Sequence, residues 1–295
     1  VKIAEGCDMG CTFCAIPLMR GRHRSRPPAD VVAEVAALAD GVAEVILVSQ
    51  DTLAYGKDLP GPDRPDFGDL LLALGETPVP WLRHLYLHPA HVNDRLIDKL
   101  ARARALPYLD MPIQHADDGL LRAMRRAVTR RRMADIVRAL RAALPDATLR
   151  TTVLVGFPGE TEAAFDRLLE FLEEAAFDRV GVFTYSAEEG TPAAGMAEPV
   201  PADVAAERAR VVQETEDRRA WERQRKLVGT VREVLVDGPS ESRAFRWEGR
   251  TAAQAPEIDG VVSLKDADLR AGQRLPVRIV EADGYDLVGV AASRG

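Results

Sequence analysis

The sequence predicts an α/β protein in which a parallel β-sheet with crossover helices is followed by a smaller β-barrel. Short apolar segments of strand length alternate with segments of helical period over the first two thirds of the 295-residue chain. This alternation ends in a Gly-, Pro- and Ala-rich stretch at 190–204, and beyond one more helical segment only strand-like segments remain. We therefore expect two domains, because single hydrophobic cores stop growing near roughly 250 to 300 residues.

Six strands are expected in the first part, at 1–6, 44–50, 83–89, 107–114, 149–157 and 179–186. Helical segments lie between them, at 28–41, 66–76, 93–103, 129–145 and 161–177. Repeated β-α units of this kind form a parallel sheet with right-handed crossovers. An open doubly wound sheet and an incomplete (βα)6 barrel both fit this count. In either fold, ligands bind at the carboxyl ends of the strands.

The second part begins with a charged helix at about 202–227. Short alternating segments follow, separated by Gly, Pro and Asp turns, at 229–238, 242–250, 260–264, 274–284 and 285–293. They predict a small antiparallel β-barrel of about 65 residues. We expect three parts in the chain: 1–200, a connecting helix at 201–227, and 228–295.

Composition favours a soluble, cytoplasmic protein. No apolar run approaches the roughly 20 residues that span a bilayer, and the first residues lack the pattern of a signal peptide. The net charge of −7 argues against a surface that binds nucleic acid throughout. A reducing compartment would keep the few cysteines as thiols that can bind metal.

All three cysteines form one C-x3-C-x2-C motif, at Cys7, Cys11 and Cys14, directly after the first predicted strand. Three clustered thiols could bind an iron-sulfur cluster that leaves one iron without a protein ligand. They could also bind zinc, with His23 as the fourth ligand. A third interpretation is that they are inert buried side chains.

The motif CDMGCTFC, with Phe13 before the last cysteine, resembles the signature of the radical S-adenosylmethionine (SAM) superfamily. This resemblance implies a 4Fe-4S cluster on the three thiolates, with SAM chelating the fourth iron. One electron then cleaves SAM to a 5'-deoxyadenosyl radical, so the cofactors carry the chemistry and no further catalytic side chain is expected. The resemblance also implies the partial (βα)6 barrel rather than the open sheet.

The same resemblance suggests that residues after the strands bind SAM. Ser49, Gln50 and Asp51 would face its amino end, Gln114 a ribose hydroxyl, and the segment VGFPGET its adenine. The predicted cofactor-binding residues are therefore Phe13, Ser49, Gln50, Asp51, Gln114, Gly156, Phe157, Glu160 and Tyr185. Each alone is also explained as a turn or capping residue.

Within the superfamily, the patterns at 11–27, 155–161 and 185–193 are similar to the methylthiotransferases, and 228–295 resembles their TRAM domain, which positions the substrate. The sequences SQDTLAYG at 49–56 and APEIDG at 255–260 resemble the RimO family. That family implies methylthiolation of the β-carbon of an aspartate in ribosomal protein uS12. The sister group that modifies tRNA adenosine, and a non-catalytic zinc-bound ribosome- or RNA-binding module, are the alternatives.

Charge favours the protein substrate. Residues 228–295 hold nine basic and eleven acidic side chains, a net charge of −2, whereas an RNA-binding barrel should be basic. The loop RGRHRSR after the cysteines carries Arg20, Arg22, Arg24 and Arg26, which are weak candidates for substrate binding.

Members of the resembled family carry a second 4Fe-4S cluster on three cysteines of an additional domain. This chain starts at the first barrel strand and has no spare cysteine, so we expect it to lack that domain and not to complete the transfer alone. The expected partners are uS12 or the small ribosomal subunit and an electron donor such as flavodoxin or ferredoxin, with no membrane.

Overall fold

The computed structural model describes residues 1–242, 244–265 and 268–292. Its first part contains the predicted strands as β1 (Ala4–Glu5), β3 (Glu44–Leu47), β4 (Trp81–His84), β5 (Tyr108–Asp110), β6 (Thr148–Val155) and β7 (Arg179–Thr184). A short strand that the sequence did not predict, β2 (Arg24–Ser25), pairs antiparallel with β1. The expected α/β order of elements is confirmed.

The strands lie side by side in chain order. Ladders join β3 to β4 and β5 to β6 and β7, all in parallel. A parallel bridge between Lys2 and Val48 brings the first strand beside β3, and the Leu106 amide donates to the Leu82 carbonyl between β4 and β5. This order is that of the predicted partial (βα)6 barrel.

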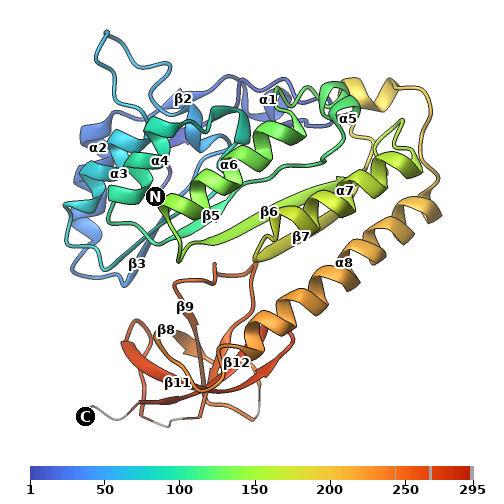
Figure 1. Cartoon of the computed structure of the whole chain (residues 1–295). Coiled ribbons are helices and arrows are strands. Elements are labelled where there is room, and N and C mark those ends of the chain that lie inside the picture. Colours follow the sequence, from blue (N-terminus) through green and yellow to red (C-terminus); the bar gives the residue numbers. More distant parts are fainter. Residues whose placement is uncertain (243, 266–267, 293–295) are drawn as a thin grey trace.

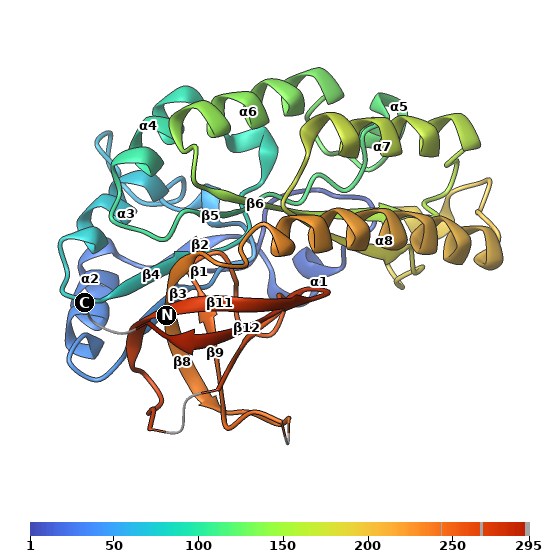
Figure 2. The same ribbon diagram turned by 60° about the horizontal axis from the view of Figure 1, so that its bottom comes forward.

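Helices cover the outer side of these strands, as Figures 1 and 2 show. The helices of the first part are α1 (Ile16–Arg20), α2 (Pro28–Leu38), α3 (Phe67–Gly75), α4 (Asp94–Arg102), α5 (Asp118–Ala123), α6 (Arg130–Ala143) and α7 (Glu162–Ala175), with 3-10 turns η1 (Thr52–Ala54), η2 (Pro89–His91) and η3 (Pro192–Gly195). Side-chain caps fix several starts: the Thr161 hydroxyl, for example, accepts from the Ala164 amide at the start of α7.

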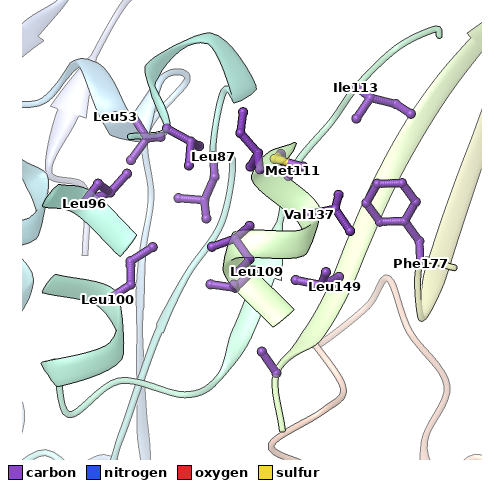
Figure 3. Close-up of a cluster of buried hydrophobic side chains, with 14 of the residues drawn as sticks. Leu53, Leu87, Leu96, Leu100, Leu109, Met111, Ile113, Val137, Leu149 and Phe177 are labelled. Carbon is purple, nitrogen blue, oxygen red and sulfur yellow. The ribbon is translucent and has the colours of Figure 1, made fainter. Parts of the chain in front are cut away.

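The main core fills the space between strands and helices. Leu109 on β5, Leu149 on β6 and Val137 on α6 are almost completely buried together (Figure 3). Such burial of aliphatic side chains stabilises each by roughly 1.5–3 kcal/mol. The core therefore holds the strand ends, where the polar loops begin, in fixed positions.

The second part consists of α8 (Ala202–Arg225) and a closed barrel of β8 (Val231–Pro239), β9 (Trp247–Thr251), β10 (Val262–Leu264), β11 (Arg274–Asp283) and β12 (Asp286–Ala291). The predicted small barrel is thus confirmed. Four neighbouring pairs are antiparallel, whereas β10 and β12 pair in parallel. One parallel pair is unavoidable, because strict alternation of direction cannot close around five strands.

The small barrel packs under the first residues of the large-domain strands, at the end of α8 (Figure 1). Arg250 of β9 pairs with Glu44 at the start of β3, and the Tyr108 hydroxyl at the start of β5 donates to Asp259 at 2.6 Å. The loop 254–260 therefore lies against the interior of the partial barrel. Among the described residues, we find no helix with the length and apolarity needed to cross a membrane.

Candidate active site

The cysteine loop leaves β1 through a glycine that cannot be replaced without strain. Gly6 has φ +84°, and a Cβ there would lie 2.1 Å from the Arg22 carbonyl oxygen. Its amide donates to Gln50 Oε1 at 2.8 Å, which ties the loop to the end of β3. The Cys7 amide donates to the Gly21 carbonyl at 3.2 Å. These contacts fix where the first thiol points.

Burial makes two of the three thiols, Cys7 and Cys14, hard to ionise. Cys11 is buried, and Cys7 and Cys14 are half-buried. Burial raises the pKa of Cys7 to about 11 and also raises that of Cys14. The only positive group that contacts a thiol within the described residues is Arg126, whose Nη1 donates to Cys11 Sγ at 3.6 Å. The surroundings of Cys7 and Cys14 therefore favour the thiolate form only when cations offset its charge.

The three cysteines line one cavity of about 370 Å³ at the carboxyl ends of the strands. Its wall is largely apolar with a few convergent polar groups, as is usual for sites that bind small molecules. The lining residues are Cys7, Met9, Cys11, Phe13, Cys14, Ile16, Gln50, Asp51, Tyr86, His88, Asp110, Pro112, Gln114, Arg126, Arg150, Thr152, Phe183 and Ile258.

The geometry does not favour the zinc interpretation. No group of three or more His, Cys, Asp or Glu side chains in the described ranges is close enough to bind a single metal ion. The His23 ring does not line the cavity and hydrogen-bonds the Ser25 hydroxyl at 3.2 Å. A 4Fe-4S cluster needs no such convergence, because each thiolate binds a different iron. Three thiols around one cavity are a donor set that fits it.

Four of the predicted cofactor-binding residues line this cavity: Phe13, Gln50, Asp51 and Gln114. Gln114 has φ +69°, a left-handed conformation uncommon for a residue with a side chain. Its amide and carbonyl pair with Thr152 and Leu154 of β6, so the neighbouring strand holds this backbone in place. Strained backbone of this kind is often found at functional sites.

The other predicted cofactor-binding residues are not among those lining the cavity. The Ser49 hydroxyl is buried and accepts from the Asp51 amide at 3.3 Å. Gly156 has φ +77°, and a Cβ there would lie 2.5 Å from Ala205 Cβ, so α8 packs closely against it. Phe157 packs edge-on against both Phe13 and Tyr185, with ring centroids 6.5 and 5.5 Å apart. Phe157 therefore supports the Phe13 ring, and Tyr185 in turn packs against Phe157.

Glu160 lies in a buried network rather than at the cavity. Its carboxylate accepts from Arg208 Nη1 of α8 at 3.0 Å, from His115 Nε2 at 3.1 Å and from the Gly156 amide. Because its carboxylate accepts hydrogen bonds from all three donors, Glu160 joins α8 to the turn after β6.

The basic loop also lies outside the cavity lining. Arg22 is 94% exposed, Arg24 donates to carbonyls of its own loop, and Arg26 pairs with Glu34. Arg20 lies 3.8 Å from Glu5. The structure thus gives these arginines local contacts, and their role toward a substrate stays a prediction.

Sequence reasoning missed several polar residues of the cavity. His88, Asp110, Arg126, Arg150 and Thr152 all line it. The His88 Nδ1 accepts from the Ala90 amide at 3.2 Å, so the ring proton is on Nε2, which is buried without a partner in the described part of the chain. Burial lowers the pKa of His88 to about 3, so this ring offers a neutral N–H donor. Asp110 and Arg150 lie within apolar strand segments, where a single polar residue does not by itself indicate a binding site.

Comparison with known proteins identifies the family of this chain. The model of the radical SAM superfamily matches residues 1–172, and that of the TRAM domain matches 228–291. The chain is 46% identical to a ribosomal protein uS12 methylthiotransferase RimO of Thermus thermophilus, covering 99% of this chain and 69% of the relative. The chain belongs to the RimO family.

A second RimO relative, from Anaeromyxobacter sp. strain K, is 46% identical over the whole chain. Several RimO relatives are longer than this chain, which spans 63% of the Anaeromyxobacter protein and 61% of the Sorangium cellulosum protein. RimO-family membership implies a 4Fe-4S cluster and SAM as cofactors of the cavity, and the thiols and Arg126 fit both.

Solved structures share the fold with this RimO-family chain. A radical SAM methyltransferase, TsrM from Kitasatospora setae, has a TM-score of 0.55 at 18% identity, covering 81% of this chain and 42% of its own. Coproporphyrinogen III oxidase (HemN) from Escherichia coli has a TM-score of 0.53 at 13% identity, covering 83% and 63%. At these identities the likeness concerns the fold alone.

Proposed function

We propose that this chain is the catalytic part of a radical SAM methylthiotransferase that modifies the β-carbon of an aspartate in ribosomal protein uS12. The observation that carries the proposal is the single cavity that the three thiols share with Gln50, Gln114 and Arg126. The named activity of the RimO relatives supports the choice of reaction and substrate.

The residues of the cavity have distinct roles in this proposal. Cys7, Cys11 and Cys14 hold the 4Fe-4S cluster, which when bound supplies the electron for cleavage of SAM and so for removal of a hydrogen atom from the substrate. Arg126, which contacts Cys11, binds the SAM carboxylate by charge-assisted hydrogen bonds. Gln114 binds the ribose.

The remaining groups orient the cofactor and exclude water. Gln50 and Asp51 face the amino end of SAM, and Phe13 provides an apolar surface that Phe157 supports. Burial alone would raise the pKa of Asp51, but the His91 ring, 3.6 Å from its carboxylate, helps to bring that pKa below its usual value. Asp51 is therefore a carboxylate that can accept from an ammonium group.

The proposed division of labour follows the architecture. Residues 1–200 form the radical SAM core, 201–227 connect, and 228–295 recognise uS12 or the small ribosomal subunit. The net charge of −2 in the last part suits a basic ribosomal protein better than RNA. We further propose action in the cytoplasm, with flavodoxin or ferredoxin as electron donor. We also propose that a second 4Fe-4S cluster is bound only in full-length family members, outside the part that this chain matches.

Anaerobic reconstitution tests the core of the proposal. The chain is loaded with iron and sulfide, and bound iron, visible absorbance and release of 5'-deoxyadenosine are measured after addition of dithionite and SAM. We expect about four irons per chain and SAM cleavage. Cys11→Ala should lose both, while Arg131→Gln on the exposed surface of α6 should keep both.

Two results would contradict the proposal. A colourless protein that retains zinc and never cleaves SAM would reinstate the zinc-bound module. Binding of a tRNA anticodon stem-loop with a steep salt dependence, and no binding of uS12, would favour the tRNA-modifying sister group.

A further inference from the structure

Arg150 is a partly buried cation in the cavity that has no part in the cofactor contacts described above. It is the third residue of β6, and its side chain is 14% exposed. Its Nη1 donates to Asp110 Oδ1 at 2.9 Å and to the Thr152 hydroxyl at 3.0 Å. These two contacts fix the guanidinium in one orientation.

One side of this guanidinium is left for a ligand. A guanidinium carries five N–H groups, and in the described residues both side-chain hydrogen bonds of Arg150 use Nη1. Its Nη2 lies beside Gly181 of β7, where an added Cβ would be 3.1 Å away. The missing side chain at Gly181 therefore leaves the space in which Arg150 presents Nη2.

The other cation that lines the cavity, Arg126, already has hydrogen-bond partners. Arg126 donates to Cys11 Sγ at 3.6 Å and to the Pro112 carbonyl at 2.6 Å, so it lies beside the cysteines. Arg150 instead contacts Asp110 and Thr152, on the two neighbouring strands β5 and β6. The cavity thus has one cation at the cysteine loop and another among the strands.

Arg150 can also be reached from a second direction. It lines a further cavity of about 290 Å³ at the junction with the small barrel, together with Arg179, Gln213 and Tyr285. Ile258 of the loop 254–260 lines both cavities. Arg150, unlike Arg179, also lines both cavities, so a polypeptide segment that enters at this junction would pass Arg150 on its way to the cysteines.

We propose that Arg150 binds the carboxylate of the substrate aspartate. This inference rests on the proposed function, since it assigns the group that recognises the substrate in the same cavity. A planar guanidinium matches the geometry of a carboxylate. In aspartate the β-carbon is bonded directly to the carboxylate carbon, so a carboxylate bound by Arg150 would direct the β-carbon toward the rest of the cavity. Arg150 acts as a specificity-determining residue, and no bond forms or breaks at it.

The test compares uS12 with a uS12 variant whose target aspartate is replaced by asparagine. Dissociation constants of both are measured by fluorescence anisotropy with the anaerobically reconstituted chain and SAM. We expect the wild type to prefer the aspartate form by roughly 10- to 100-fold, as for a charge-assisted hydrogen bond. Arg150→Gln should bring this ratio close to one, and Arg150→Lys should give an intermediate ratio. The control Arg131→Gln should keep the wild-type ratio.

A second variant tests the same contact without removal of the Arg150 charge. Gly181→Ala would place a Cβ 3.1 Å from Arg150 Nη2 while leaving Asp110 and Thr152 in place. It should lower the preference for the aspartate form of uS12 several-fold. A merely structural role for Arg150 would weaken binding of both uS12 forms equally and leave the ratio unchanged, which would overturn the inference.

Three other outcomes separate this inference from the proposed function. If the wild type binds uS12 with the expected ratio and Arg150→Gln keeps it, only the assignment of Arg150 is wrong. If the wild type binds neither uS12 form, the proposed substrate is wrong and the inference fails with it. Loss of SAM cleavage without uS12 in Arg150→Gln, but not in Arg131→Gln, would assign Arg150 to the cofactor instead.

Discussion

Arg250 of the small barrel and Glu44 of β3 form a buried ion pair across 206 residues of sequence, with Nη2 and Oε2 2.8 Å apart. The other Glu44 oxygen accepts from Arg83 Nε at 2.7 Å, and Arg250 also pairs with Asp237 at 2.8 Å. Arg250, Glu44 and Arg83 are each less than a tenth exposed. This network joins the two domains.

Removal of Arg250 should weaken the junction. Arg250→Ala leaves Glu44 and Asp237 without a shared partner, and loss of one member of a buried ion pair costs about 3 kcal/mol. Denaturant unfolding measures the free energy, and limited proteolysis between α8 and β8 reports separation of the domains. Arg232→Ala, at an exposed position of β8, should change neither. Equal stability of Arg250→Ala and Arg232→Ala would show that the apolar contacts alone hold the junction.

Glu160 offers a comparison of two carboxylates on one arginine. Arg208 contacts Glu160, which is completely buried, and Glu162, which is 77% exposed. Glu160→Gln should lower the free energy of unfolding by about 3 kcal/mol, because Arg208 loses its buried counter-charge. Glu162→Gln should cost under about 1 kcal/mol. A Glu160→Gln protein of normal stability with weakened SAM binding would instead place Glu160 at the cofactor.

Two glycines of the cysteine loop should respond differently to alanine. Gly6→Ala places a Cβ 2.1 Å from a carbonyl oxygen and forces a positive φ, whereas a Cβ at Gly10 has no heavy atom within 4 Å. The strain at Gly6 should cost about 2 kcal/mol or more and displace Cys7. We expect iron content after reconstitution to fall sharply in Gly6→Ala and to stay normal in Gly10→Ala. Similar iron contents in the two variants would contradict a fixed loop.

His84 should make stability depend on pH. Burial lowers its pKa from 6.5 to about 4, with a smaller effect from the charge of Arg83. The unfolded chain therefore binds a proton more readily, so the contribution is complete above about pH 6.5 and is lost as pH falls toward about 4. The loss at pH 5 should be about 2 kcal/mol. His84→Gln should reduce the difference between the free energies of unfolding that urea titrations give at pH 7 and at pH 5. An unchanged difference would exclude His84 as its source.

Much of the large domain could be predicted, because apolar runs of strand length alternate with amphipathic helices. The residues after the strands were more difficult. Gln50 and Asp51 both line the cavity while their neighbour Ser49 does not, because the chain bends after β3 and the side chains no longer alternate as in a strand. No spacing rule could select between them without the structure.

Other features depend on contacts that sequence patterns do not encode. Arg150 and Asp110 lie in apolar segments, and their cavity position becomes visible only when β5 and β6 are paired. Glu160 was predicted at the cofactor from its place after β6, but α8 brings Arg208 to it from 48 residues away. The short strand β2 and the junction at Arg250 arise in the same way, from distant pairings.

Ile258 belongs to the small barrel yet lines the cavity of the cysteines. The two domains are therefore not interchangeable modules. A chimaera that exchanges residues 228–295 with those of a relative would also exchange part of the pocket wall, and could alter substrate choice without any change in the large domain. Directed evolution of this enzyme class could thus vary the loop 254–260 while leaving the cysteine motif untouched.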